Sequence, residues 1–166
     1  MTRMAAIATL AGVLTAGVLA AGLLNGQQGP QVAFPEGYRD WAHVKSAVIL
    51  PGHVNYEAFG GVHHVYANDL AVGALKDGTP LPKGAVLVFD LLEETVEDNA
   101  ITEGPRKVIG VMEKDPDRFA DTEGWGFEDF RLGDPSQPSV RDMREQCLSC
   151  HESRRASDFV YSVYRR

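Results

Sequence analysis

The stretch "GAVLVFDLLEE", residues 84–94, carries the strongest strand pattern in this chain of 166 residues. Its apolar run is nearly continuous instead of alternating with polar residues, which is typical of a strand buried on both faces. We therefore predict a strand from Gly84 to about Glu93 in the interior of the domain.

Four further runs around this stretch have the composition of strands. They are rich in β-branched and aromatic residues and end at Pro, Gly or charged residues. These runs lie at residues 44–50, 62–67, 107–113 and 124–131. A loop rich in Glu, Asp and Asn follows residue 94. Because the connections are too short for repeated crossover helices, the pattern predicts a mostly antiparallel sheet.

Short helices are expected between and after these strands. Asn68 can cap a helix that ends at Gly78. Asp115 followed by Pro116 begins a shorter helix, and Ser139 with Asp142 forms an S-x-x-D start for a helix near the C-terminus. The predicted fold class is α+β, an antiparallel β-sheet with short helices, one of which carries the end of the chain.

The first residues predict export. Residues 1–24 hold one arginine and a long apolar run, which is the layout of a signal peptide cleaved after Ala20 or Ala21. The run is also long enough to stay as an N-terminal membrane anchor. Residues 25–33 are a linker and residues 34–166 form one domain, which is placed in the periplasm in either case.

Net charge narrows the class of partner. Without Arg3, 15 Lys and Arg stand against 23 Asp and Glu. This acidic surface repels nucleic acid and anionic lipid, and it favours a basic partner or a small neutral ligand. The same charge is also explained by solubility alone.

The only two cysteines lie in the sequence Cys147-Leu-Ser-Cys150-His151. C-x-x-C-H is the attachment sequence of a c-type haem. On a helix, residues three apart share one face, so both thiols reach the vinyl groups of one porphyrin. His151 is then the proximal iron ligand. The motif predicts one covalent haem c per chain.

Three other readings of the motif are weaker. A redox disulfide normally belongs to a thioredoxin-like βαβ pattern, which the chain does not show. A zinc site needs two further ligands, and no pair at suitable spacing is found among the other histidines, which are His43, His53, His63 and His64. A chance match is disfavoured because the predicted export takes the chain to the compartment in which bacterial c-type haem attachment occurs.

No residue stands out as a sixth ligand to the iron. Met143 lies four residues before Cys147 on the same predicted helix, so it cannot reach the other haem face. Met112 lies in an apolar strand, where core packing is the simpler role. His63 and His64 point to opposite faces of their strand, so one of them is expected to be a buried, hydrogen-bonded core histidine.

Five blocks of sequence together resemble the cytochrome P-460 family over essentially the whole exported chain. They are "FPEGYRDWAHVKS", "HHVYAND", "GAVLVFDLLEE", "KDPDRFADTEGWGFEDF" and "CLSCHESRRASDFVYSVYR". The resemblance implies a small periplasmic monohaem protein, usually a homodimer, built on an antiparallel sheet with the haem bound late in the chain.

The resemblance also separates two branches. Namesake members oxidise hydroxylamine with a haem that a lysine cross-links, and here the matching position in Pro82-Lys-Gly-Ala-Val-Leu-Val-Phe89 is Phe89. Lys83 is out of register. The chain is therefore more similar to the cytochrome c-prime-beta branch, which implies that Phe59 and Phe89 lie over the open face of a five-coordinate haem.

This branch implies binding of nitric oxide or a similar small diatomic gas. The alternative is an oxidoreductase that acts on hydroxylamine or nitric oxide together with a redox protein partner. A plain electron carrier is the third alternative. Arg106 and Lys107 are candidates to meet the haem propionates. The resemblance also implies a distal carboxylate, which the namesake enzymes use. The register favours none of the five candidates, which are Glu93, Glu94, Glu97, Glu103 and Glu113.

Overall fold

The computed structural model describes residues 31–165 of the chain. The predicted signal peptide or anchor, residues 1–24, lies outside the described residues. Within the described part, no helix is long and apolar enough to cross a membrane. The fold already includes Val32, which is buried in a core cluster two residues before the expected start of the domain.

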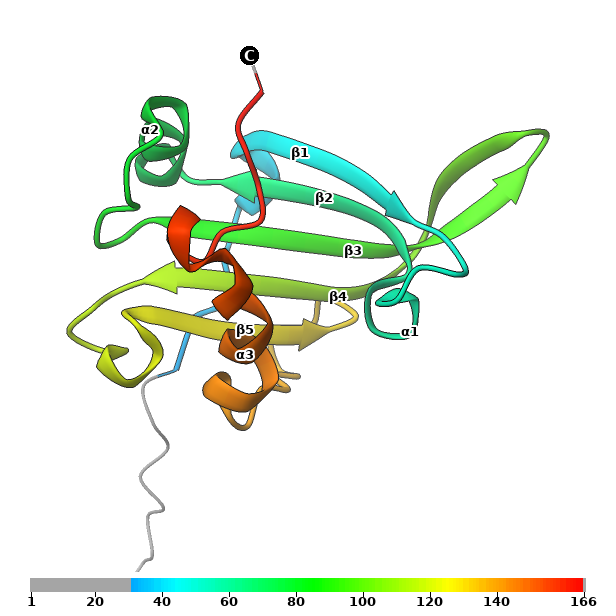
Figure 1. Cartoon of the computed structure of the whole chain (residues 1–166). Helices are drawn as coiled ribbons and strands as arrows, with labels where there is room; N and C mark the ends of the chain where they lie inside the picture. The colour runs from blue at the N-terminus through cyan, green and yellow to red at the C-terminus, as the bar shows by residue number, and fades with distance from the viewer. Residues whose placement is uncertain (1–30, 166) are drawn as a thin grey trace, which may run out of the picture.

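Five antiparallel strands form one sheet in the order β1-β2-β3-β4-β5, so every strand pairs with its neighbour in sequence (Figure 1). The strands are β1 (Ala42–Ile49), β2 (Gly61–Ala67), β3 (Val86–Glu97), β4 (Ala100–Lys114) and β5 (Trp125–Arg131). The α+β class with an antiparallel sheet is confirmed, and the stretch at residues 84–94 forms the middle strand of the sheet.

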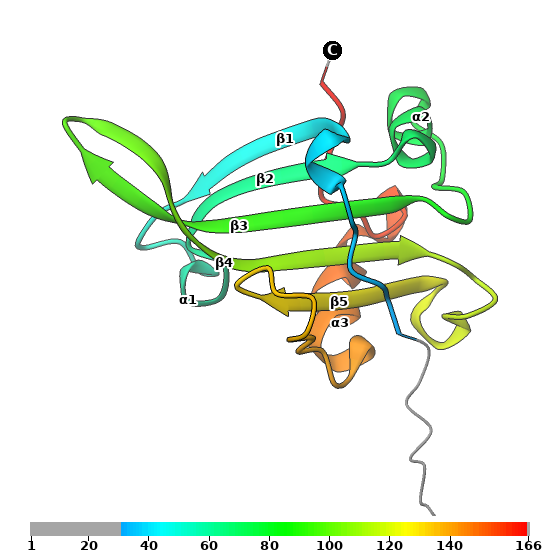
Figure 2. The same cartoon turned by 180° about the vertical axis from the view of Figure 1, so that it is seen from behind.

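The two faces of the sheet are covered by the two ends of the described chain. On one face lies the C-terminal segment, which contains η3 (Arg144–Leu148), α3 (Ser149–His151) and η4 (Glu152–Ser157). On the other face runs the N-terminal segment with η1 (Tyr38–Asp40), as Figure 2 shows. We call these the C-terminal face and the N-terminal face.

The strand register decides which side chains share a face. Phe89 on β3 pairs with Val65 on β2 and with Gly110 on β4. Gly110 in turn pairs with Asp129 on β5. Residues paired across strands lie on the same face, whereas their sequence neighbours point to the opposite one. Phe89 and Asp129 therefore project from the same row of the sheet.

The helix predicted after Asn68 is confirmed as α2 (Asp69–Asp77). The Asn68 side chain accepts a hydrogen bond from the Ala71 N–H, and Gly78 ends the helix in the left-handed conformation with φ of 66°. Two short elements complete the fold: α1 (Tyr56–Phe59) between β1 and β2, and η2 (Ala120–Thr122) before β5.

The acidic segment after residue 94 differs from the expectation of a loop. It continues β3 and β4 as a long hairpin that projects beyond the rest of the sheet (Figure 1). Asp98 and Asn99 form its tip with φ of 49° and 61°. This pair of left-handed residues matches the twist of a two-residue hairpin turn, so local turn geometry extends the strands despite their polar composition.

Two predicted helix starts also differ. The segment after Asp115 forms turns instead of a helix, and the C-terminal helical segment begins near Asp142, three residues later than Ser139. The Ser139 N–H is taken by Glu128 and by the Asp129 carbonyl, which holds this residue against β5. The Asp142 carboxylate instead accepts from two N–H groups that open the helical turn.

Candidate haem site

The C-x-x-C-H motif lies on the C-terminal face, where a π-helical turn passes into α3 (Figure 1). Cys147 is partly buried and Cys150 is exposed, and both are free thiols. Burial, together with the negative charges of Asp129 and Glu128, raises the pKa of the Cys147 thiol to about 12. The first thiol thus faces the sheet, while the second faces outward.

The His151 ring is held by its Nδ1 atom. Nδ1 donates a hydrogen bond to the Phe159 carbonyl oxygen at 2.7 Å, so the hydrogen resides on Nδ1 and the Nε2 lone pair is left for a metal. The ring centroid lies 5.3 Å from that of Phe127 and 5.2 Å from that of Tyr161. Burial lowers the pKa of His151, which favours the neutral form that a metal binds.

A tight backbone turn aims the Phe159 carbonyl at His151. Asp158 and Phe159 are both left-handed, with φ of 50° and 64°. The Asp158 carboxylate accepts from the Leu81 N–H at 2.9 Å and from Lys114 Nζ at 2.8 Å. These two bonds tie the turn to the sheet, so the orientation of His151 depends on contacts far from it in sequence.

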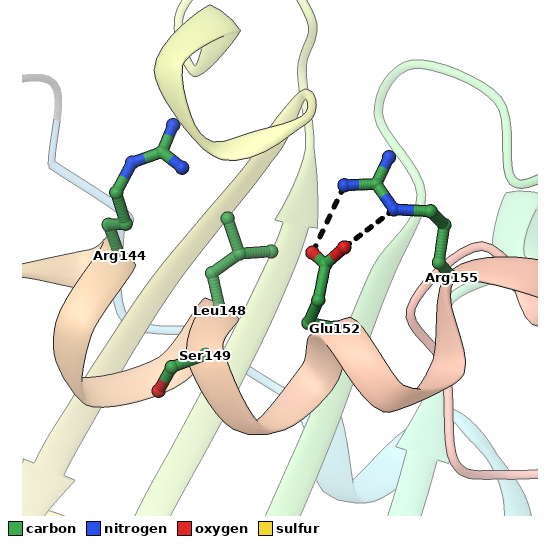
Figure 3. Close-up of a pocket in the computed structure, with 5 residues that line it drawn as sticks. All are labelled: Arg144, Leu148, Ser149, Glu152 and Arg155. Carbon is green, nitrogen blue, oxygen red and sulfur yellow. Dashed lines mark hydrogen bonds and ion pairs between the residues drawn. The ribbon is translucent and has the colours of Figure 1, made fainter.

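Charged side chains fasten the outer side of the C-terminal segment. Arg155 bridges Glu152 at 2.7 Å and Glu123 at 3.0 Å, and Arg144 donates to the Asp121 carbonyl. Five side chains of this segment line a hollow of about 330 Å³, and Figure 3 shows how these side chains lie. Neither the two cysteines nor His151 line this hollow. It lies beside the Arg155–Glu152 ion pair and is not the candidate site.

Phe59 and Phe89 come together on the C-terminal face, although they are thirty positions apart in sequence. Their ring centroids are 6.1 Å apart in an edge-to-face arrangement. Two hydrogen bonds hold the end of α1 that carries Phe59: His63 Nε2 donates to the Phe59 carbonyl at 2.5 Å, and Lys107 Nζ donates to the Gly60 carbonyl at 2.8 Å. These bonds fix the backbone at Phe59, while the residue itself is 41% exposed.

The neighbouring residues His63 and His64 lie on opposite faces of the sheet, as predicted. His63 is buried, and its ring lies 4.7 Å from that of Phe89. His64 is on the other face, bonded to Ser46 at 2.8 Å and to Glu103 at 3.1 Å. Met112 packs against the core cluster beneath the C-terminal segment, as expected of a core residue.

Arg106 is not brought together with the other predicted site residues. Its Nε donates to Asp90 Oδ1 at 2.7 Å and its Nη2 donates to Asp90 Oδ2 at 3.1 Å. Asp90 follows Phe89 on β3 and therefore points to the N-terminal face, where Tyr38 also bonds it at 2.7 Å. Here Arg106 neutralises a buried carboxylate on the face opposite the cysteines.

Three of the carboxylates named from the sequence have other partners. Glu94 accepts from Tyr56, Glu103 from His64 and Glu113 from Arg118. The carboxylate that does lie beside Phe89 is Asp129, which sequence reasoning missed. A usable signal was present, because Trp125, Phe127 and Asp129 alternate in phase, and the two aromatic residues mark the buried face.

The comparison with protein families decides the relationship. The family described as Cytochrome P460 matches residues 35–162. The chain belongs to this family. Among proteins with curated descriptions, none matches the chain. Membership in the cytochrome P460 family implies a haem cofactor.

The residues present fit this cofactor. Two free thiols flank the turn that ends at His151, and the imidazole offers its Nε2 because the Phe159 carbonyl occupies Nδ1. On the same face of the sheet, Phe89 and Asp129 pack over Gly110: a methyl group on Gly110 would lie 3.5 Å from Phe89 Cδ1 and 3.0 Å from Asp129 Oδ1. The thiols, the imidazole and the aromatic pair of Phe59 and Phe89 thus all lie on the C-terminal face of the sheet.

Proposed function

We propose that this protein binds nitric oxide or a similar small diatomic gas at a five-coordinate haem c. Cys147 and Cys150 hold the haem covalently, one per chain, and His151 is the single protein ligand to the iron. When bound, the haem supplies an open coordination position for the gas. The observation that carries the proposal is the contact between Phe59 and Phe89, 6.1 Å between ring centroids, on the same face as the motif.

The candidate ligands named from the sequence support the open position. His63 donates its Nε2–H to the Phe59 carbonyl, and Met112 belongs to the core beneath the C-terminal segment. His64 lies on the N-terminal face. Each of these side chains therefore has a structural role that explains it without a bond to iron.

The aromatic pair gives a physical basis for selectivity. Dioxygen as a haem ligand draws negative charge and is stabilised by a hydrogen-bond donor, whereas nitric oxide and carbon monoxide need little polar help. The rings of Phe59 and Phe89 offer no such donor and also exclude water. A wall of this kind favours nitric oxide and carbon monoxide over dioxygen.

A second candidate function is oxidation of hydroxylamine or nitric oxide, which the P460 membership favours. The residue that separates the two is Phe89, since it stands where the resemblance places a cross-linking lysine. We further propose that the protein is exported to the periplasm and acts as a homodimer, and that any redox partner is a protein with a basic surface, because the exported chain is acidic.

The test is the absorption spectrum of the full chain, expressed together with haem-attachment machinery, in both oxidation states and with nitric oxide or carbon monoxide. We expect a high-spin five-coordinate spectrum that changes on addition of either gas. A low-spin six-coordinate ferric spectrum would contradict the proposal, as would a colourless polypeptide. A ferrous band far to the red of an ordinary c-type haem would indicate the oxidoreductase instead.

Two variants sharpen this test. Met112→Leu should leave the spectrum unchanged, because a core methionine contributes volume and no iron bond. Phe89→Lys should move the ferrous spectrum toward that of a cross-linked haem. A spectrum that changes in Phe89→Lys and not in Met112→Leu would distinguish a residue of the proposed gas site from a residue that only packs in the core.

A further inference from the structure

Asp129 is the polar side chain that the register brings to the aromatic wall. On β5, Trp125 and Phe127 are buried in the core beneath the C-terminal segment, and Asp129 is the next residue on their face. Phe127 touches the ring of His151. Asp129 therefore follows, two residues along the same strand, a ring that packs against the proposed iron ligand.

Gly110 leaves the space that the Asp129 carboxyl group enters. A methyl group on Gly110 would lie 3.0 Å from Asp129 Oδ1, which is tighter than ordinary contact, and 3.5 Å from Phe89 Cδ1. The carboxyl oxygen and the phenyl ring thus lie next to each other over Gly110. A side chain larger than hydrogen at Gly110 would displace one of them.

The Asp129 carboxyl group lacks a hydrogen-bond donor within the described part of the chain. Among residues 31–165, none donates a hydrogen bond to it or forms an ion pair with it. The adjacent Glu128, by contrast, accepts from the N–H groups of Asp129, Ser139 and Val140. A half-buried carboxyl group with unused hydrogen-bonding capacity is available to a ligand.

The surroundings of Asp129 favour its protonated form. Burial, and then the charge of Glu128, raise its pKa to about 6. The other ionisable groups on the elements around it are Arg131 on β5, His63 on β2, Lys107 on β4, and Asp142, Cys147 and His151 in the C-terminal segment. Of the two cations, Lys107 donates to the Gly60 carbonyl, and Arg131 is exposed and forms no ion pair with Asp129.

We propose that the Asp129 carboxyl group is the polar contact for the gas in this site: it donates one hydrogen bond to the ligand when protonated and withdraws it when ionised. This inference rests on the proposed function and adds regulation to it. An apolar wall alone discriminates against dioxygen at every pH. With Asp129 beside Phe89, the discrimination against dioxygen is weaker in acid than in neutral solution.

The experiment follows the C–O stretching frequency of the ferrous carbon monoxide complex of the full-length holoprotein, from below to above about pH 6. A hydrogen bond to the ligand oxygen lowers this frequency. In the wild type we expect the frequency to rise with pH, with its midpoint near the pKa of Asp129. Asp129→Leu should show the higher frequency at every pH, and Asp129→Asn should stay pH-independent because an amide does not titrate.

A matched control and a second measurement complete the test. Asp77→Asn removes an exposed carboxylate at the end of α2 and should keep the wild-type titration. Below the midpoint, the affinity for dioxygen relative to carbon monoxide should be roughly two- to ten-fold lower in Asp129→Leu than in the wild type, the worth of one hydrogen bond.

The outcomes separate this inference from the proposed function. If carbon monoxide binds but the frequency is independent of pH in the wild type, or if Asp129→Leu still titrates, the role of Asp129 is refuted and the gas site stands. If carbon monoxide does not bind to the wild type, both proposals fall.

Discussion

Replacing Arg106 with methionine removes two of the four hydrogen bonds to a fully buried carboxylate. Asp90 has no exposed side-chain surface, and Arg106 meets it with Nε at 2.7 Å and Nη2 at 3.1 Å. Tyr38 at 2.7 Å and Arg39 at 3.2 Å remain. The substitution keeps most of the volume of the side chain and removes its charge.

The expected loss of stability follows from this geometry. Breaking a buried ion pair by removing one partner costs about 3–5 kcal/mol, because the remaining charge stays buried. Arg106 is 31% exposed, so water reaches part of the gap, and Tyr38 still donates to the carboxylate. We therefore expect the lower end, a fall of about 3 kcal/mol in the free energy of unfolding.

Denaturant unfolding of the holoprotein at neutral pH measures this fall, and Arg39→Met is the matched control. Arg39 binds the same Asp90 oxygen as Tyr38 but is 58% exposed, so its removal should cost less than about 1 kcal/mol. The haem spectrum of Arg106→Met should equal that of the wild type, because Arg106 lies on the N-terminal face. A changed spectrum would mean that Arg106 contacts the haem.

The pH dependence has a defined sign. Burial of Asp90 opposes ionisation, but the hydrogen bonds from Arg106 and Tyr38 outweigh it and hold the pKa of Asp90 below its ordinary value. Stability from this pair is thus present above the unfolded pKa of about 4 and is lost as the pH falls through the lower folded value. The difference between wild type and Arg106→Met should shrink below about pH 4. A difference that is independent of pH, or no larger than that of Arg39→Met, would refute the reasoning.

Three further substitutions test the elements that carry the site. Gly61→Ala should cost about 4 kcal/mol or more, because φ is +121° and the new methyl would lie 2.0 Å from the Leu92 carbonyl; a melting temperature near that of wild type contradicts this. Asn68→Ala should cost about 1–2 kcal/mol in denaturant unfolding, since its side chain accepts from N–H groups that begin α2 and β3. Lys114→Met removes the cation paired with Asp158 where both side chains are mostly buried and leaves the carboxylate only the Leu81 N–H and Trp125 Nε1 as donors, so we expect a loss of about 3 kcal/mol; a loss below about 1 kcal/mol would show that water screens the pair.

The strands and α2 could be predicted because their signals are local. The apolar run at residues 84–94, the cap at Asn68 and the stop at Gly78 each act through the backbone within a few residues. The hairpin beyond residue 94 was missed because its polar composition is typical of a loop. Its strand structure depends on the left-handed pair Asp98 and Asn99, whose conformation composition does not report.

The site residues could be predicted only where they form a motif of neighbouring residues in the sequence. The order of Cys147, Cys150 and His151 identifies the attachment motif directly. Whether Arg106 faces the haem depends on a bulged register between β3 and β4, and a shift of one residue moves a side chain to the opposite face. The position of Asp129 depends on register as well, and also on the missing side chain at Gly110, over which the carboxyl group packs only in the assembled sheet.

The strand order affects the order in which the parts of the fold form. Each strand joins the one made just before it, so the sheet closes only short loops, and such local closures are fast. The segment with the two thiols follows all five strands along the chain and packs against the face that they form. In the proposed holoprotein, the sheet thus forms from neighbours in sequence before this segment docks on it, which leaves Cys147 and Cys150 accessible to the attachment machinery until late in folding.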